Sequence, residues 1–305
     1  MMNPLLKSLL TAATVTAMVL ACSIALIAPQ LRMSVVGPPA VQEKRHYTFD
    51  AIQRLRLENN DGALRVRPHE GDAVEVEARI TMYTYSPEDG PMAREYRDSL
   101  LVAEAANGAL TLISEPDERP GELKVFVDYA IRVPVGTDLH IDNGNGNVWV
   151  GRGSGQVNVQ GRNADLEVFA PRGKVTARTT NGRIRVLEAP HGADLETVNG
   201  NVYAHVSGGR LRADSTNGAV VARVLDAEVE ACDLTSKNGG ITVVLSEPSA
   251  EVYAETGRGS VRSDLPLDPR ALTQRRQMRG AIGDGETRLN LHTLNGNIWI
   301  RGNTP

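Results

Sequence analysis

The chain has 305 residues, a formal net charge of −4, 29 Gly and only 4% aromatic residues. This composition is poor material for a thick globular core, and the mild acidity gives no broad electrostatic reason to expect a nucleic acid partner. The two cysteines, Cys22 and Cys232, lie far apart and the 6 histidines show no zinc-ligand spacing, so neither a disulfide framework nor a zinc site is expected.

Residues 1–36 are predicted to form a membrane segment. Lys7 precedes an uncharged, mostly apolar run at residues 8–29, which is long enough to span a bilayer as a helix. Two alternatives are a cleaved signal peptide, because residues 21–23 are small, and lipidation at Cys22. The favoured interpretation is an uncleaved anchor that holds the bulk of the chain outside the cytoplasm, in the cell envelope.

Residues 37–46 are polar and contain proline, which is typical of a linker. From 47 to 135, short apolar–polar–apolar segments such as Leu55-Arg56-Leu57 flank corners rich in asparagine and glycine, as at 59–62. We expect this N-terminal β region to cap the open end of the repeats that follow, because terminal repeats cover the core of a stacked array.

Residues 136–303 are predicted to form a β-solenoid. Between 144 and 224 the sequence divides into nonapeptides such as TNGRIRVLE, with glycine recurring at the third position and small or branched apolar residues at the fifth and seventh. A turn residue followed by apolar–polar–apolar predicts a short strand with one buried face, and the fixed period predicts a stack. The expected fold is therefore all-β, a parallel β-helix or β-solenoid, with an irregular insertion at 264–287.

An asparagine occupies the second position of alternate nonapeptides, so each coil has 18 residues and two strands. The column consists of Asn145, Asn163, Asn181, Asn199 and Asn217. Strands stack at about 4.8 Å, so these amides are predicted to hydrogen-bond along the axis as a ladder. We interpret the column as structural and expect its side chains to turn inward at the corner, while Asn147 faces outward.

The corners also carry a family resemblance. The stretches TTNGRIRV, TVNGNVYA, STNGAVVA, SKNGGITV and TLNGNIWI follow an apolar N-terminal segment. Together they resemble the bacterial DUF4097 family, whose members are also labelled adhesins. The resemblance covers roughly residues 55–301 and implies a right-handed solenoid, and it brings no catalytic motif with it.

The sequence can be checked for a calcium site and for the active site of a glycosidase. Nonapeptide coils that bind calcium need a carboxylate at each corner, whereas these corners carry Asn, Gly, Arg and Ser, so we expect no metal and no cofactor. Outward-facing Asp194, Glu196 and Asp214 are predicted to cluster on adjacent coils, as a glycosidase would require. Arg178 and Arg212 on flanking coils would neutralise them, which favours a solvated charged ladder.

Exposed aromatic and basic residues are candidates for an interaction surface. Trp149 and Tyr203 are predicted to face outward three coils apart, too far to form one stacking platform, and Trp299 lies in the final repeat. The insertion adds Arg275, Arg276 and Arg279, which suit either a solvated loop or contact with an acidic partner or lipid headgroups.

These observations favour a non-catalytic, membrane-anchored and adhesin-like module that binds a protein or glycan partner at the cell envelope. Two alternatives remain open. One is a carbohydrate-active β-helix enzyme that uses Asp194, Glu196 and Asp214, and the other is an accessory protein of an envelope-stress system.

Overall fold

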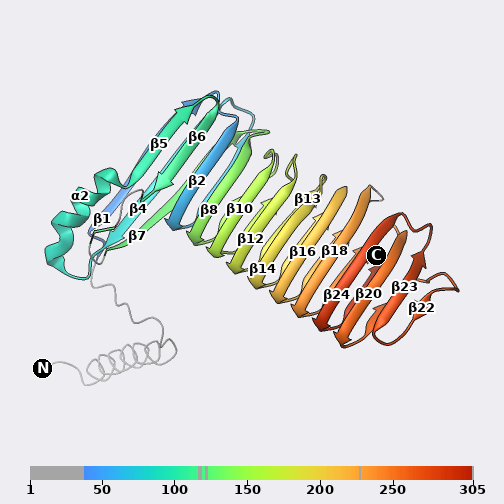
Figure 1. The fold of residues 1–305 in the computed structure, drawn as a ribbon. Coiled ribbons are helices and arrows are strands. Elements are labelled where there is room, and N and C mark those ends of the chain that lie inside the picture. The colour runs from blue at the N-terminus through green and yellow to red at the C-terminus, as the bar shows by residue number, and fades with distance from the viewer. Residues whose placement is uncertain (1–37, 116–118, 121–122, 227, 304–305) are drawn as a thin grey trace, which may run out of the picture.

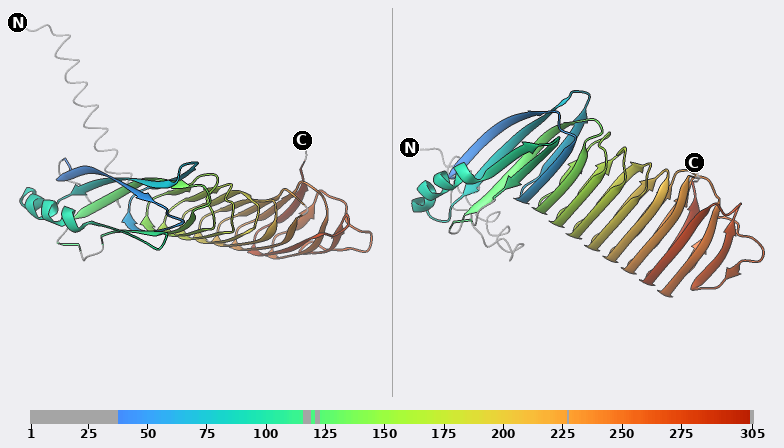
Figure 2. Two further views of the ribbon diagram at one scale, coloured as in Figure 1. Left: turned by 90° about the horizontal axis from the view of Figure 1, so that it is seen from above. Right: turned by 45° about the horizontal axis from the view of Figure 1, so that its top comes forward.

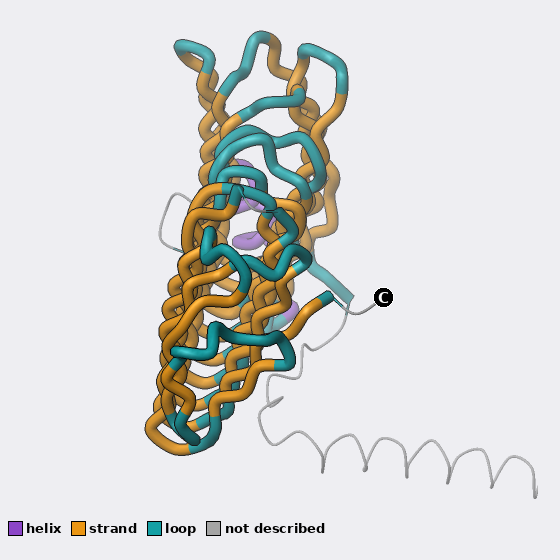
Figure 3. The backbone as a smooth tube through the Cα atoms, turned by 90° about the vertical axis from the view of Figure 1, so that its right-hand side faces the viewer, coloured by secondary structure: helices purple, strands orange, loops and turns teal. Residues whose placement is uncertain are grey.

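The computed structural model describes residues 38–115, 119–120, 123–226 and 228–303. They form an elongated solenoid in which one sheet of 12 strands faces another of 13 strands, with a layer of apolar side chains between them. Figures 1 and 2 show the long stack, and Figure 3 looks along it at the two layers and the loops that join them. The chain is therefore all-β with long parallel sheets, as the repeat predicts.

The N-terminal part combines coils of the stack with antiparallel strands and one helix (Figure 1). Its elements are β1 (Val41–Asp50), β2 (Arg54–Asp61), β3 (Leu64–His69), β4 (Ala73–Tyr83), the 3₁₀ helix η1 (Pro87–Asp89), α2 (Gly90–Ser99), β5 (Leu101–Ala106), β6 (Ala109–Ser114) and β7 (Lys124–Pro134).

The linker predicted at 37–46 is wrong from Val41 onward. Strand β1 pairs antiparallel with β4 along its whole length, from Val41 opposite Met82 to Asp50 opposite Ala73. Its polar residues alternate between two sides: Lys44 faces solvent and forms an ion pair with Glu77 at 3.1 Å, whereas Arg45 is part-buried and donates to the Arg97 carbonyl at 2.9 Å.

The central part is a regular stack in which each coil contributes one strand to each sheet. Its strands are β8 (Asp138–Asn145), β9 (Val148–Val150), β10 (Val157–Asn163), β11 (Leu166–Phe169), β12 (Val175–Asn181), β13 (Ile184–Ala189), β14 (Ala193–Asn199), β15 (Val202–Val206), β16 (Gly209–Asn217), β17 (Val220–Val224), β18 (Val229–Asn238) and β19 (Ile241–Leu245). Val157 pairs with Val175 and Leu166 with Ile184, so the parallel register advances by one coil per strand. Alternate residues point inward and are buried, which gives one continuous core.

Glycine at the corner is required by both conformation and space. Gly182 has a φ of 151°, and a Cβ placed there would lie 2.0 Å from the carbonyl oxygen of Ala164 in the neighbouring coil. The corners therefore stack backbone on backbone, which only a residue without a side chain permits.

The C-terminal part departs from sequential stacking. Its strands are β20 (Ala250–Arg258), β21 (Val261–Ser263), β22 (Leu272–Thr273), β23 (Gln277–Ile282), β24 (Thr287–Asn295) and β25 (Ile298–Gly302). The last coil, β24–β25, lies between β18–β19 and the earlier coil β20–β21. The insertion predicted at 264–287 contains β22 and β23, and β23 pairs antiparallel with β20 to cover the outermost coil.

The N-terminal end has a similar arrangement, in which β2–β3 lies between β6–β7 and β8–β9. The predicted membrane segment at 1–36 lies outside the described residues. Within the described ranges, no helix has both the length and the apolar character needed to cross a bilayer.

Candidate functional site

The asparagine column is a hydrogen-bonded ladder along one corner of the 13-stranded sheet. Each Nδ2 donates to the Oδ1 of the residue one coil nearer the N-terminal end of the stack. The bonds are Asn145 to Asp61 at 2.8 Å, Asn163 to Asn145 at 2.6 Å, Asn181 to Asn163 at 2.7 Å, Asn199 to Asn181 at 2.8 Å, Asn217 to Asn199 at 2.9 Å, Asn238 to Asn217 at 2.8 Å and Asn295 to Asn238 at 2.8 Å.

The ladder faces solvent, which corrects the expectation that it turns inward. Asn163, Asn181, Asn199 and Asn217 are exposed, because the residue two positions earlier occupies the inward side of the corner. There Thr179, Thr197 and Ser215 are buried, and each hydroxyl donates to a corner carbonyl of the preceding coil at 2.9–3.0 Å. Sequence reasoning missed this second column, although the Thr or Ser that precedes x-Asn-Gly was its signal.

The carboxylate cluster exists as predicted from the register, and its members are ion-paired. Asp194 and Glu196 of β14 each lie 3.3 Å from the guanidinium of Arg178 on β12. Asp214 of β16 accepts a 2.8 Å hydrogen bond from Arg212, which raises the pKa of that guanidinium. Salt bridges satisfy these side chains, across adjacent strands for Asp194 and Glu196 and within β16 for Asp214, and this is the arrangement of a charged sheet surface.

Trp149 and Tyr203 lie on β9 and β15, three coils apart on the outer face of the 12-stranded sheet. Two residues between them, which sequence reasoning did not single out, connect them. The ring of Phe169 lies 5.7 Å from that of Trp149, and the guanidinium of Arg185 lies 5.8 Å from Phe169 and 6.0 Å from Tyr203. The result is a strip along the stack in which two aromatic rings are followed by a guanidinium and a third aromatic ring.

The third aromatic candidate is remote from this strip. Trp299 of β25 is separated from β15 by β17 and β19, its indole N–H donates to Asp264 at 2.9 Å, and Arg301 lies over its ring. Of the predicted arginines, Arg279 lies 4.9 Å from the ring centroid of Tyr253.

Arg275 and Arg276 are exposed, and they take part in the fold through their backbone. Their carbonyls accept hydrogen bonds from Val261 at 3.0 Å and Thr256 at 2.9 Å. The structure therefore places these three arginines of the insertion in the cap over the outermost coil, β20–β21, away from Trp149 and Tyr203.

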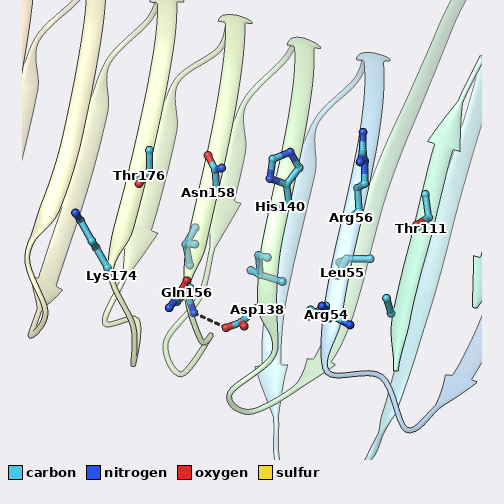
Figure 4. A pocket seen from close by; sticks show the side chains of 13 residues that line it. Arg54, Leu55, Arg56, Thr111, Asp138, His140, Gln156, Asn158, Lys174 and Thr176 are labelled. Atoms are coloured by element: carbon cyan, nitrogen blue, oxygen red, sulfur yellow. Dashed lines mark hydrogen bonds between the residues drawn. The ribbon is translucent and has the colours of Figure 1, made fainter. Parts of the chain in front are cut away.

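A hollow of about 600 Å³ lies on the outer face of the 13-stranded sheet, across β6, β2, β8, β10 and β12 (Figure 4). One row of side chains across it consists of Thr111, Arg56, His140, Asn158 and Thr176, and a second contains Arg54, Asp138, Gln156 and Lys174. The Oδ1 atom of Asn158 is buried and has no hydrogen-bond partner among the described residues.

The charges of this hollow suit binding. Arg56 is paired with Glu58, whereas Arg54 and Lys174 have no ion-pair partner in the described part of the chain. Asp138, the one carboxylate among the described lining residues, accepts the backbone N–H of Gln156 at 2.7 Å. The hollow thus offers amides, hydroxyls and two free cations beside a single engaged carboxylate. In the described ranges no group of three His, Cys, Asp or Glu could hold a metal ion.

Solved structures that resemble this chain are distant in sequence. A protein described as a "putative adhesin" from Bacteroides fragilis NCTC 9343 is 11% identical, with a TM-score of 0.46 and coverage of 87% of this chain and 98% of that one. A "putative lipid binding protein" from Parabacteroides distasonis ATCC 8503 is 10% identical, with a TM-score of 0.45 and coverage of 88% and 98%. No curated protein matches the chain.

The match to a family model is more specific. The model described as Toastrack DUF4097 matches residues 126–301, which is more than half of the chain and includes the five Asn-Gly corners that carry the family resemblance. The chain therefore belongs to the DUF4097 family.

Proposed function

We propose that this protein is a non-catalytic interaction module of the cell envelope, anchored in the membrane by its N-terminal segment and displayed outside the cytoplasm. The observation that carries the proposal is the composition of the hollow on the 13-stranded sheet. It presents hydrogen-bonding side chains and two unpaired cations to a ligand, together with one carboxylate that the fold already uses. Glycoside cleavage needs two carboxyl groups on either side of the scissile bond, and this hollow supplies one.

The carboxylate cluster supports the same conclusion. Asp194, Glu196 and Asp214 lie on β14 and β16, beyond the strands that line the hollow, and arginines neutralise all three. Their oxygens are engaged by guanidiniums on an open sheet surface, whereas a glycosidase holds two carboxyl groups on either side of the scissile bond.

The experiment compares binding with turnover in the full-length chain. Envelope polysaccharides and surface proteins are immobilised for binding, and the same polysaccharides are assayed for new reducing ends. We expect retention without cleavage, and weaker retention when Arg54→Ala and Lys174→Ala are combined. A matched change, Arg210→Ala combined with Arg212→Ala on β16, lies outside the hollow and should leave retention unchanged. New reducing ends that disappear in Asp194→Asn would establish the enzyme instead.

Localisation is tested separately. The full-length chain should stay in the membrane fraction after high-salt and carbonate washes, and its β domain should be accessible to protease from outside the cytoplasm. Complete release by carbonate, or protection of the β domain from external protease, would contradict the proposed anchoring.

A further inference from the structure

The outer face of the 12-stranded sheet carries a second hollow, where the N-terminal strands join the stack. The register places Ala130 of β7 between Glu77 of β4 and Arg65 of β3. Because the methyl group of Ala130 is much shorter than its neighbours, the surface is depressed there. Two hollows of about 530 and 410 Å³ share these three residues and form one trough. Trp149 of β9 lies at its solenoid side.

Each carboxylate that lines the trough already has a partner. Glu75 pairs with Arg132 at 3.0 Å, and Glu77 pairs with Lys44 at 3.1 Å. The Lys44 ammonium, by donating to it, lowers the pKa of the Glu77 carboxyl group. Asp128 accepts the backbone N–H of Ala63 at 2.8 Å. These acids are therefore neutralised or used by the fold.

Two guanidiniums of the trough remain without a carboxylate. Arg65 and Arg67 lie 5.5 and 6.0 Å from the ring centroid of Trp149, and neither forms an ion pair within the described ranges. Contact with an aromatic face leaves most N–H donors of a guanidinium free, and their planar arrangement suits a carboxylate that accepts two hydrogen bonds. The trough thus has two cationic groups available to an anion.

Trp149 is held in place beside them. A Cβ at Gly151 would lie 2.9 Å from Cη2 of the indole, so the glycine makes room for the ring to lie against its own strand. Phe169 supports it on the next coil at 5.7 Å, and the indole stays half-buried. An aromatic ring in this position offers an apolar surface next to a charged group, which is what the mixed surface of a sugar ring requires.

We propose that the trough binds acidic sugar residues of a polysaccharide. Arg65 and Arg67 bind the carboxylate through charge-assisted hydrogen bonds, and Trp149 packs against the sugar ring. A polymer is favoured because Phe169, Arg185 and Tyr203 extend the row of rings and guanidiniums from Trp149 along the stack, one coil at about 4.8 Å. The one carboxylate in this row, Glu167, is paired with Arg185 at 3.9 Å. The inference rests on the proposed function, and it adds to the hollow of the 13-stranded sheet a second binding surface with a stated ligand class.

The test measures binding of the full-length chain to polygalacturonate, to its methyl ester and to a single-stranded oligonucleotide. We expect binding to polygalacturonate, with affinity that falls as salt is raised, and weak or no binding to the ester and the oligonucleotide. Combining Arg65→Gln with Arg67→Gln should lower the affinity about 10- to 100-fold, as expected for loss of hydrogen bonds to a charged group. Trp149→Ala should lower the affinity without changing its salt dependence.

The control is Arg210→Gln combined with Arg212→Gln, which removes the same charge from the 13-stranded sheet and should change affinity less than about twofold. Thermal melts of each variant show whether a loss of binding reflects unfolding. Equal losses in the two double variants, equal binding of the methyl ester, or equal binding of the oligonucleotide would each overturn the proposal. If the trough fails one of these tests, the proposed function still holds when another envelope polymer is retained and Arg54→Ala with Lys174→Ala weakens that retention.

Discussion

Nδ2 of Asn199 lies 2.8 Å from Oδ1 of Asn181 one coil away, and both side chains are exposed. Water can replace the lost partners when such a bond is removed. Asn199→Leu removes two such bonds, one to Asn181 and one from Asn217, and should therefore lower the free energy of unfolding by only about 1–2 kcal/mol. Denaturant melts of the two chains give this difference directly.

The buried column next to the ladder provides the comparison. Thr197 is 2% exposed, and its hydroxyl donates to the carbonyl of Gly182 at 3.0 Å. Thr197→Val keeps the shape and removes the donor, which should cost about 1–3 kcal/mol because a buried acceptor loses its hydroxyl partner. If Asn199→Leu lowers the free energy of unfolding more than Thr197→Val does, the exposed ladder stabilises the corner more than the buried hydroxyls.

Gly182→Ala should be among the most damaging single changes in the stack. The added Cβ meets the Ala164 carbonyl oxygen at 2.0 Å while φ is 151°, so the backbone of two coils must shift. We expect a loss of about 3 kcal/mol or more in a denaturant melt. The control is Gly136→Ala, where φ is 88° and nothing lies within 4 Å of the new atom. That change should cost only about 1–2 kcal/mol, from backbone conformation alone.

The repeat made the stack predictable, because a spacing of 18 residues brings Asn181 beside Asn163 whatever the details of packing. The same spacing does not say which side of the corner an asparagine faces. Burial is decided by the residue two positions earlier, where Thr179 takes the inward place. Polar residues at both positions are compatible with either arrangement, so the sequence pattern alone left the choice open.

The order of coils at the two ends could not be predicted from the sequence. Residues 250–263 and 287–302 both consist of a strand, a glycine corner and a second strand, and either could stack on β18–β19. The structure places the later one there, with Asn295 continuing the ladder from Asn238 and Arg258 beyond it. An asparagine fits the amide ladder and an arginine does not, which accounts for the observed order.

Both hollows depend on this non-sequential packing. Thr111 reaches the hollow of the 13-stranded sheet because β6 lies beside β2. Ala130 lies near Trp149 because only one strand, β3, lies between β7 and β9. The carboxylate cluster was predictable since its members lie on consecutive coils. Sites formed by strands distant in sequence need the topology before their side chains can be placed together.

Asp194→Asn combined with Glu196→Gln should leave the fold nearly unchanged. Both carboxylates contact Arg178 at 3.3 Å on a solvated surface, where the ion pairs are screened. The expected loss is less than about 1 kcal/mol in a denaturant melt. The variant should also bind polygalacturonate as the unaltered chain does, since both residues lie on the opposite sheet from the trough. A large loss of stability would mean that this ladder holds the coils together.

The last prediction concerns alkaline stability. Burial raises the pKa of Tyr129, whose hydroxyl lies 2.9 Å from that of Ser114, from 10.0 to about 12. Burial likewise raises the pKa of the Cys232 thiol from 9.0 to about 12. The native state keeps these protons at pH values where the unfolded chain has released them. The contribution of these two groups to the free energy of unfolding is therefore complete below their pKa values in the unfolded chain. It is lost as the pH rises from about 9 to about 12.

Urea melts at about pH 8 and about pH 11 measure this loss, and Tyr129→Phe should reduce the difference between them by about 1 kcal/mol. The variant is also expected to be less stable at the lower pH, because Ser114 loses its partner, so only the difference between the two pH values is diagnostic. In a Cys22→Ser background, Cys232 should react with a thiol reagent only after denaturation, since its side chain is fully buried. An unchanged pH dependence in Tyr129→Phe would show that the hydroxyl of Tyr129 ionises in the folded protein as it does in the unfolded chain.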